Sequence, residues 1–159
     1  MIRAADDASG VVRLAVINAL AALRHPASAE PLAGLLTGRA LLPKESKTEA
    51  APLSESAEYE ALAQALGALE AAAVSPLLRL LDAEKRDTRR WAARALGLTR
   101  DPRAVEPLLR RLVDNRSEVR KAAAQALGEI GNARALDPLI QCLSNRDHEL
   151  RRAAAIALG

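Results

Sequence analysis

Residues 88–97 read TRRWAARALG, residues 119–128 read VRKAAAQALG and residues 150–159 read LRRAAAIALG. The glycines that end these three segments, at positions 97, 128 and 159, are separated by two equal intervals. Two weaker copies precede them, EYEALAQALG at residues 58–67 and VRLAVINALA at residues 12–21. Self-similarity at a fixed period of this length is the signature of a repeat architecture, in which each unit is one supersecondary element.

A second motif lies between these copies. It reads AVSPL at residues 73–77, AVEPL at residues 104–108 and ALDPL at residues 135–139, with a reduced form, AEPL, at residues 29–32. Its prolines, Pro76, Pro107 and Pro138, recur with the same period as the glycines. Two motifs that stay in phase over three units indicate that each unit contains two helices.

Each unit therefore predicts a first helix with an apolar stripe and a second helix that begins near the proline. Proline is tolerated in the first turn of a helix, because its missing N–H has no partner there. The glycines at the end of the first motif are Gly67, Gly97 and Gly128, and Gly128 suits the left-handed turn that closes a helix. The predicted units cover about 9–38, 57–83, 87–113 and 117–143, with a half-unit at 147–159.

The composition agrees with helices and excludes most sheet architectures. Alanine and leucine supply 63 of the 159 residues, while the chain has no phenylalanine, one tryptophan and one tyrosine. Alanine and leucine head the helix-propensity scale, whereas β-branched and aromatic residues favour strands. A β-sandwich or β-barrel is therefore nearly excluded. A core of such small side chains requires helices that approach one another closely.

The combined pattern resembles the short bacterial HEAT-like repeats, also called phycobilisome-lyase-type HEAT repeats, over nearly the whole chain apart from about 39–56. The resemblance implies an all-α fold, an α-solenoid or superhelix of about four and a half stacked helix pairs. It also implies that the second helices line a concave face, which commonly binds a partner protein. Ala21 in place of glycine and Tyr59 in place of arginine depart from the pattern, so these two units are expected to pack less regularly.

Two irregularities interrupt the array. The spacing from Pro31 to Pro76 exceeds one period by nearly half. The inserted segment, 39–56, is predicted to be a surface loop, which is either disordered and without a functional role or in contact with a partner. The chain also begins and ends on a first helix. We therefore expect residues 1–159 to be a single repeat domain taken from a longer array, with self-association through its uncapped ends.

The charge is uneven along the chain, although the net charge is only +3. Residues 1–86 carry −2 and residues 87–159 carry +5. Nucleic-acid or polyanion binding through the basic C-terminal half is therefore an alternative, weakened by the small net charge and by the scarcity of aromatic residues for stacking. No apolar run is long enough to span a membrane, and Cys142 is the only cysteine. We expect a cytoplasmic protein without membrane insertion.

No motif of catalysis, cofactor binding or metal binding is found in the sequence. His25 and His148 fall in different units, which argues against a shared metal site. The leading interpretation is a non-catalytic scaffold that binds another protein through the concave face of the solenoid. A phycobilin-lyase-like subunit is a second alternative, which depends on the repeat family alone.

Several residues are singled out by their place in the repeat. One position of the first-helix motif repeats arginine, and this column is expected to bind loop carbonyls or an aspartate such as Asp82 or Asp114 and so to fix the stacking of units. The column consists of Arg13, Arg89, Arg120 and Arg151. The next column, Arg90, Lys121 and Arg152, is expected to be solvated.

The candidates for partner contact lie on second helices, with ordinary solvation as the alternative. They are Arg79, Arg110, Arg111 and Gln141. Trp91 stands where other units have alanine, and it is expected to be a half-buried packing residue more than an interface hot spot.

Overall fold

The computed structural model of the protein describes residues 10–37 and 55–159, and these ranges form helices without strands. Their α-helices are α1 (Gly10–Leu23), α2 (Ala29–Leu35), α3 (Glu55–Ala68), α4 (Ala71–Leu80), α5 (Arg86–Thr99), α6 (Val105–Arg111), α7 (Ser117–Ile130), α8 (Leu136–Cys142) and α9 (His148–Leu158). The predicted loop at 39–56 lies outside the described residues except for its last two positions, which already belong to α3.

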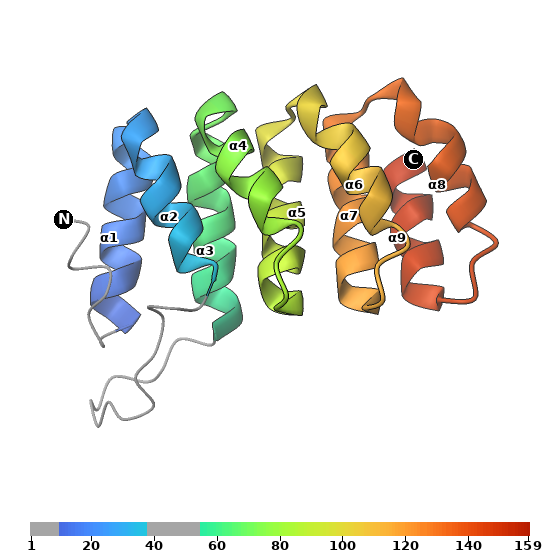
Figure 1. Ribbon diagram of the computed structural model, residues 1–159, viewed down its shortest axis with the longest axis horizontal. Helices are drawn as coiled ribbons and strands as arrows, with labels where there is room; N and C mark the ends of the chain where they lie inside the picture. The colour runs from blue at the N-terminus through green and yellow to red at the C-terminus, as the bar shows by residue number, and fades with distance from the viewer. Residues whose placement is uncertain (1–9, 38–54) are drawn as a thin grey trace.

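The helices form two layers that run along one axis (Figure 1). The first helices of the units, α1, α3, α5, α7 and α9, each pack against the next first helix. Of the second helices, α4, α6 and α8 pack mainly on the first helices α5, α7 and α9, and α2 packs on both α4 and α3. The predicted all-α solenoid is confirmed. Its core is a continuous row of buried alanine and leucine side chains that neighbouring units share, as repeat proteins require.

The repeated glycines lie inside helices, so the expectation that Gly128 closes its helix is wrong. α7 continues past Gly128 to Ile130 and ends at Gly131, whose φ of 66° lies in the left-handed region. The N–H of Gly131 donates a hydrogen bond to the carbonyl of Leu127, which is the expected contact of a helix C-terminus. α5 also ends at a residue in this region, Arg100, with φ of 52°.

The repeated glycines instead allow consecutive first helices to approach each other. A Cβ atom on Gly97 would lie 2.7 Å from the Cα of Ala126 in α7, and one on Gly128 would lie 2.7 Å from the Cα of Ala157 in α9. Cβ atoms do not approach other carbon atoms so closely. Any side chain at these positions would therefore force the first helices apart.

This spacing distinguishes the two layers. First helices contact one another along their lengths, whereas among the second helices α2 packs on α4 and the pairs that follow make few contacts. We refer to the more closely packed layer, α1, α3, α5, α7 and α9, as the inner layer. The resemblance implied instead that the second helices line the concave face.

Two of the repeated prolines lie where the sequence places them, and one does not. Pro107 and Pro138 are third residues of α6 and α8, within the first turn, where the helix N–H groups have no intrahelical partner. Pro76 lies in the interior of α4, because this helix already begins at Ala71.

Arg89 shows how the repeated arginine connects two units. Its Nη1 donates to the carbonyls of Ala83 and Glu84 at 2.8 and 2.7 Å, within the loop that precedes its own helix. Its Nε and Nη2 form a bidentate pair with Asp114 of the next unit at 2.9 and 3.1 Å. Burial raises the pKa of Asp114, but the hydrogen bonds from Arg89 and the Arg116 N–H, together with the charges of Arg89 and Arg111, hold the pKa below its ordinary value. A buried bidentate pair of this kind fixes orientation as well as contact.

The same arrangement recurs in the next unit. Arg120 donates to the carbonyl of Asp114 at 2.8 Å and pairs with the carboxylate of Asp147 at the start of α9. Arg151 donates to two carbonyls of the loop before α9, at 2.8 and 3.0 Å. These are the loop carbonyls and aspartates expected of this column. The side chain of Arg13 lies outside the described residues.

Candidate protein-binding face

A cleft of about 460 Å³ opens on the inner layer. All of its lining residues come from the first helices α3, α5, α7 and α9, and they include Glu60, Trp91, Arg94, Lys121, Gln125 and Glu149. Helices from four consecutive units therefore contribute to one surface. A ligand in the cleft would contact residues that are far apart in the sequence, which is how repeat proteins form extended binding surfaces.

An aromatic stack forms part of this surface. The ring of Trp91 is stacked on the ring of Tyr59, with centroids 5.7 Å apart and planes inclined by 13°. The guanidinium carbon of Arg90 lies 4.7 Å from the centroid of the Trp91 ring, within the range of a cation–π interaction. Trp91 is only 6% exposed, which agrees with the packing role expected from the sequence. Arg90, which was expected to be solvated, is partly exposed and lies over the indole ring.

Ion pairs connect the first helices across the cleft. Lys121 Nζ lies 2.6 Å from a carboxylate oxygen of Glu149, and this hydrogen bond lowers the pKa of Glu149. Arg94 lies between two carboxylates, with Glu60 at 3.4 Å on one side and Glu129 on the other. Each pair joins a cation of one unit to a carboxylate of a neighbouring unit. Such exposed or half-exposed pairs contribute little to stability, but they determine which charges remain available to a partner.

Two further cations near the cleft differ in their partners. Arg86 pairs with Glu118 at 3.4 Å, and both side chains are about half exposed. Arg90 forms no ion pair with any residue in the described ranges. Its guanidinium group instead makes a cation–π contact with the Trp91 ring.

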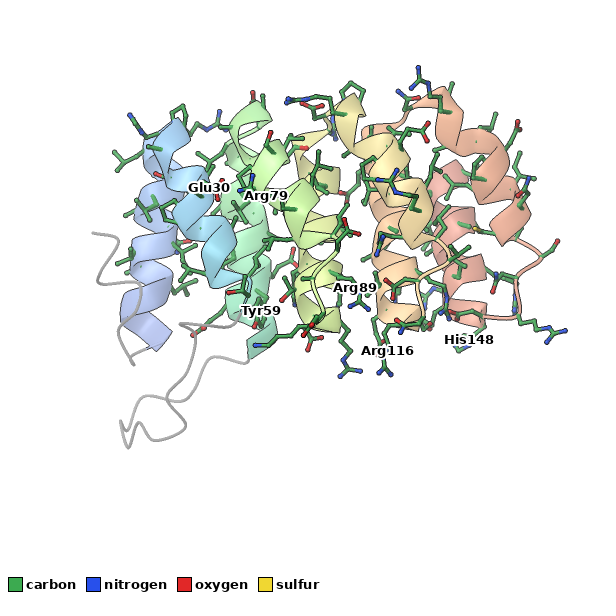
Figure 2. The ribbon with its side chains drawn as sticks, in the orientation of Figure 1. Glu30, Tyr59, Arg79, Arg89, Arg116 and His148 are labelled. Carbon is green, nitrogen blue, oxygen red and sulfur yellow. The ribbon has the colours of Figure 1, made fainter. Side chains whose placement is uncertain are left out.

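The partner-contact residues proposed from the sequence lie on the other layer. They are Arg79 on α4, Arg110 and Arg111 on α6, and Gln141 on α8. Arg79 points toward Glu30 of α2, and the two side chains form an ion pair (Figure 2). Arg111 pairs with Asp82 at 2.9 Å, so this aspartate binds a second-helix arginine and not the repeated column. Arg110 and Gln141 are exposed. The structure does not bring these four residues to the cleft.

Metal-ligating side chains are not clustered in the part of the chain that the structure describes, which contains no group of three or more of them. The Cys142 thiol is buried, and burial raises its pKa, which disfavours the reactive thiolate. Every helix of the two described ranges is too short or too polar to cross a lipid bilayer.

Sequence reasoning missed the cleft itself. Trp91 was recognised as the one large aromatic residue in a column of alanines, and that departure was the signal available. The neighbours that give it a role, such as Tyr59 and Glu60, belong to the preceding unit, about one repeat period away in the sequence. These residues come close to Trp91 because α3 and α5 pack side by side, which the sequence pattern does not show.

Two family models match the chain. The model for HEAT repeats matches residues 53–127 and 74–159, which together exceed half of the chain. The model for the PBS lyase HEAT-like repeat matches residues 12–38. No curated protein sequence matches the chain.

Three solved structures have a similar fold. A chain from the complex of CpcE and CpcF of phycocyanin lyase from Nostoc sp. PCC7120 aligns with a TM-score of 0.64 and 23% identity, over 99% of this chain and 62% of that one. An engineered protein aligns with a TM-score of 0.58 and 23% identity, over 99% and 76%. A designed armadillo repeat protein in complex with peptide (KR)4 aligns with a TM-score of 0.53 and 20% identity, over 99% and 80%. These likenesses show the fold, and the chain spans 62% of the length of the phycocyanin lyase chain.

Proposed function

The chain belongs to the HEAT-repeat family, and from this premise we propose that it is a non-catalytic scaffold that binds a partner protein across its inner, first-helix layer. The cleft beside Trp91 is the observation that carries the proposal, because side chains of four consecutive first helices meet there. Tryptophan and arginine are enriched among residues that dominate protein interfaces. Arg90, held over the buried Trp91 ring, supplies such a residue, with little side-chain entropy left to lose on binding.

The inner layer is a better candidate than the second-helix set chosen from the sequence. Two of the four residues of that set, Arg79 and Arg111, already bind carboxylates of neighbouring units. Nucleic-acid binding is less well supported, because several basic residues of the C-terminal half, among them Lys121 and Arg94, are neutralised by carboxylates in the cleft. Extended nucleic-acid sites require uncompensated positive charge along the whole groove.

Site-specific photocrosslinking tests the choice of layer. Gln125 on α7 and Gln141 on α8 are the same residue type in the same unit, but they lie on opposite layers. Each glutamine is replaced in turn by a photoreactive amino acid, and the crosslinked species are compared in cells. We expect a discrete crosslinked partner from position 125 and none from position 141. Crosslinks from position 141 alone would assign the partner to the second helices, and crosslinks from neither would contradict the scaffold proposal.

A phycocyanin-lyase-like role is the second candidate, supported by the fold likeness to the lyase chain and by the family match at residues 12–38. Its test is incubation of the protein with phycocyanin apoprotein and free bilin, followed by detection of covalently bound chromophore by in-gel fluorescence. The scaffold proposal expects no attachment above the rate without protein. Faster attachment would overturn the non-catalytic part of the proposal.

A further inference from the structure

Arg90 and Lys121 occupy the same position in consecutive units, but their side chains have different partners. The residue after Lys121 is alanine, and Lys121 reaches Glu149 of the next first helix at 2.6 Å. The residue after Arg90 is Trp91, and the guanidinium lies over that ring instead. Glu118 is the equivalent of Glu149 in the preceding unit, and it forms an ion pair with Arg86 at 3.4 Å instead. The exchange of alanine for tryptophan in one unit has therefore separated an arginine from the carboxylate that its position would otherwise bind.

The stacked position leaves the donors of Arg90 available. A guanidinium carries five N–H donors in one plane, and stacking on an aromatic ring occupies its face but not its edges. The other cations that line the cleft, Arg94 and Lys121, already bind carboxylates of the protein. Arg90 is thus the cation of this cleft whose charge is unmatched within the described residues. Its fork of donors suits a bidentate carboxylate.

We propose that Arg90, held on the Trp91–Tyr59 stack, binds a carboxylate side chain in an acidic segment of the partner protein. The inference rests on the proposed function and adds the chemistry of the partner. A carboxylate gains this pair without displacing an existing one, whereas a lysine or arginine of a partner would have to compete for Glu60 or Glu149.

The glutamates that line the cleft also favour an acidic peptide over a polyanion such as a nucleic acid. Glu118 and Glu149 lie among the lining residues of the same cleft as Arg90. A single carboxylate needs only Arg90, on α5, whereas a phosphate backbone that crossed the cleft to α7 and α9 would meet both glutamates. Like-charge contacts of this kind suppress wrong partners.

Trp91 supplies the readout, because it is the only tryptophan in the chain. Three nine-residue peptides of serine, alanine and leucine carry glutamate, glutamine or lysine at the central position and contain no aromatic residue. They are titrated against the full chain while tryptophan emission is recorded. We expect a saturable change in emission with the glutamate peptide and at least about tenfold weaker binding of the glutamine and lysine peptides, as for loss of one partner of a hydrogen-bonded charge pair.

Variants of the protein assign this preference to Arg90. In Arg90→Gln the glutamate and glutamine peptides should bind equally, and Arg90→Lys should restore part of the preference, because lysine keeps the charge but not the fork. Arg152→Gln is the matched control, since Arg152 holds the same repeat position on α9, is exposed and has no ring beside it. Circular dichroism verifies that all variants fold.

Several outcomes would overturn the inference: equal binding of the three peptides, no response to any of them, or a glutamate preference that survives Arg90→Gln. A short oligonucleotide that binds more tightly than the glutamate peptide would also overturn it. Crosslinking from position 125 does not depend on a carboxylate. A failed peptide test with crosslinking intact therefore removes the partner chemistry and leaves the binding layer in place.

Discussion

Glycine weakens a helix interior, yet α3, α5 and α7 each contain one where the next first helix comes closest. At Gly97 and Gly128 the nearest atoms include the backbone of the neighbouring helix, which cannot rotate away as a side chain can. The loss of helix propensity is therefore offset by contact between helices. At the residue scale, the fold depends on the absence of a side chain at these positions.

Replacement of Gly97 by alanine tests this role. The added Cβ would meet the Cα of Ala126 at 2.7 Å, so we expect Gly97→Ala to lower the free energy of unfolding by about 1–3 kcal/mol, the usual range for overpacking. Gly34→Ala is the matched control in α2, because nothing lies within 4 Å of a Cβ there. It should raise stability by about 0.5–1 kcal/mol through helix propensity. Urea denaturation measures both, and equal effects would contradict the close-approach argument.

The period of the glycines was visible in the sequence, but their purpose was not. A glycine near the end of an alanine-rich helix is equally compatible with a left-handed terminus and with a close helix contact. Gly131, one turn beyond Gly128, is the residue that adopts the left-handed conformation. Only the distance to the next helix separates these two roles, and that distance is a tertiary property.

Among the elements, α9 shows how helix capping and unit stacking use the same residue. Asp147 accepts hydrogen bonds from the backbone N–H groups of Glu149 and Leu150 at 3.0 and 3.4 Å. Its carboxylate also accepts from the Ser117 hydroxyl at 2.5 Å and pairs with Arg120, both in α7. The Ser117 hydrogen bond, with those from Arg120 and the two N–H groups, lowers the pKa of Asp147 to about 2.

This lowered pKa predicts the direction of the pH dependence. The ordinary value of the carboxyl is 3.8, so the folded state binds this proton more weakly than the unfolded state does. The stabilisation by Asp147 is complete above about pH 4 and is lost as the pH falls to about 2. Asp147→Asn should lower the free energy of unfolding by about 2–3 kcal/mol at pH 7, through the weakened cap and the lost ion pair with Arg120.

Thermal unfolding of both proteins across pH 2–7 measures this effect. The difference between wild type and Asp147→Asn should shrink toward zero at the acid end of the range. Asp137→Asn serves as the control, because Asp137 is exposed on α8. A difference that stays constant down to pH 2 would mean that the charge of Asp147 contributes nothing.

The sequence predicted the helices better than it predicted how the layers are arranged. Alanine and leucine at helical spacing, repeated with a constant period, are sufficient to establish helix pairs and a shared core. The same pattern shows which side of each helix is apolar, but it does not show how far apart equivalent helices lie. Arg110 and Gln141 were therefore assigned to the concave face on the resemblance alone, and the structure places the cleft on the first-helix layer.

For the whole molecule, contacts between neighbouring units replace a single central core. Leu62 in α3 and Leu150 in α9 are both fully buried, but they belong to opposite halves of the row (Figure 1). In such arrays the stability is approximately a sum of unit terms and nearest-neighbour terms. A substitution that destabilises one unit should therefore affect mainly that unit and its neighbours.

Hydrogen exchange tests this expectation. Leu62→Ala should lower the free energy of unfolding by about 2–5 kcal/mol, as for other buried leucines, and accelerate amide exchange most in α1, α3 and α5. Leu150→Ala is the mirror-image variant, and it should accelerate exchange most in α7, α8 and α9. Mass spectrometry of exchanged peptides locates the change. If both variants accelerate exchange equally in every helix, the molecule unfolds as one cooperative unit and the nearest-neighbour description is wrong.

The close contact of the first helices also gives the inner layer a fixed scale of length. Packed helices stand about 8–10 Å apart, and an extended chain advances about 3.3 Å per residue. A strand-like segment laid across these helices would therefore advance one unit for about every three of its residues. Because side chains of a strand alternate between its two faces, a side chain and the sixth one after it would face the layer together and meet equivalent repeat positions two units apart.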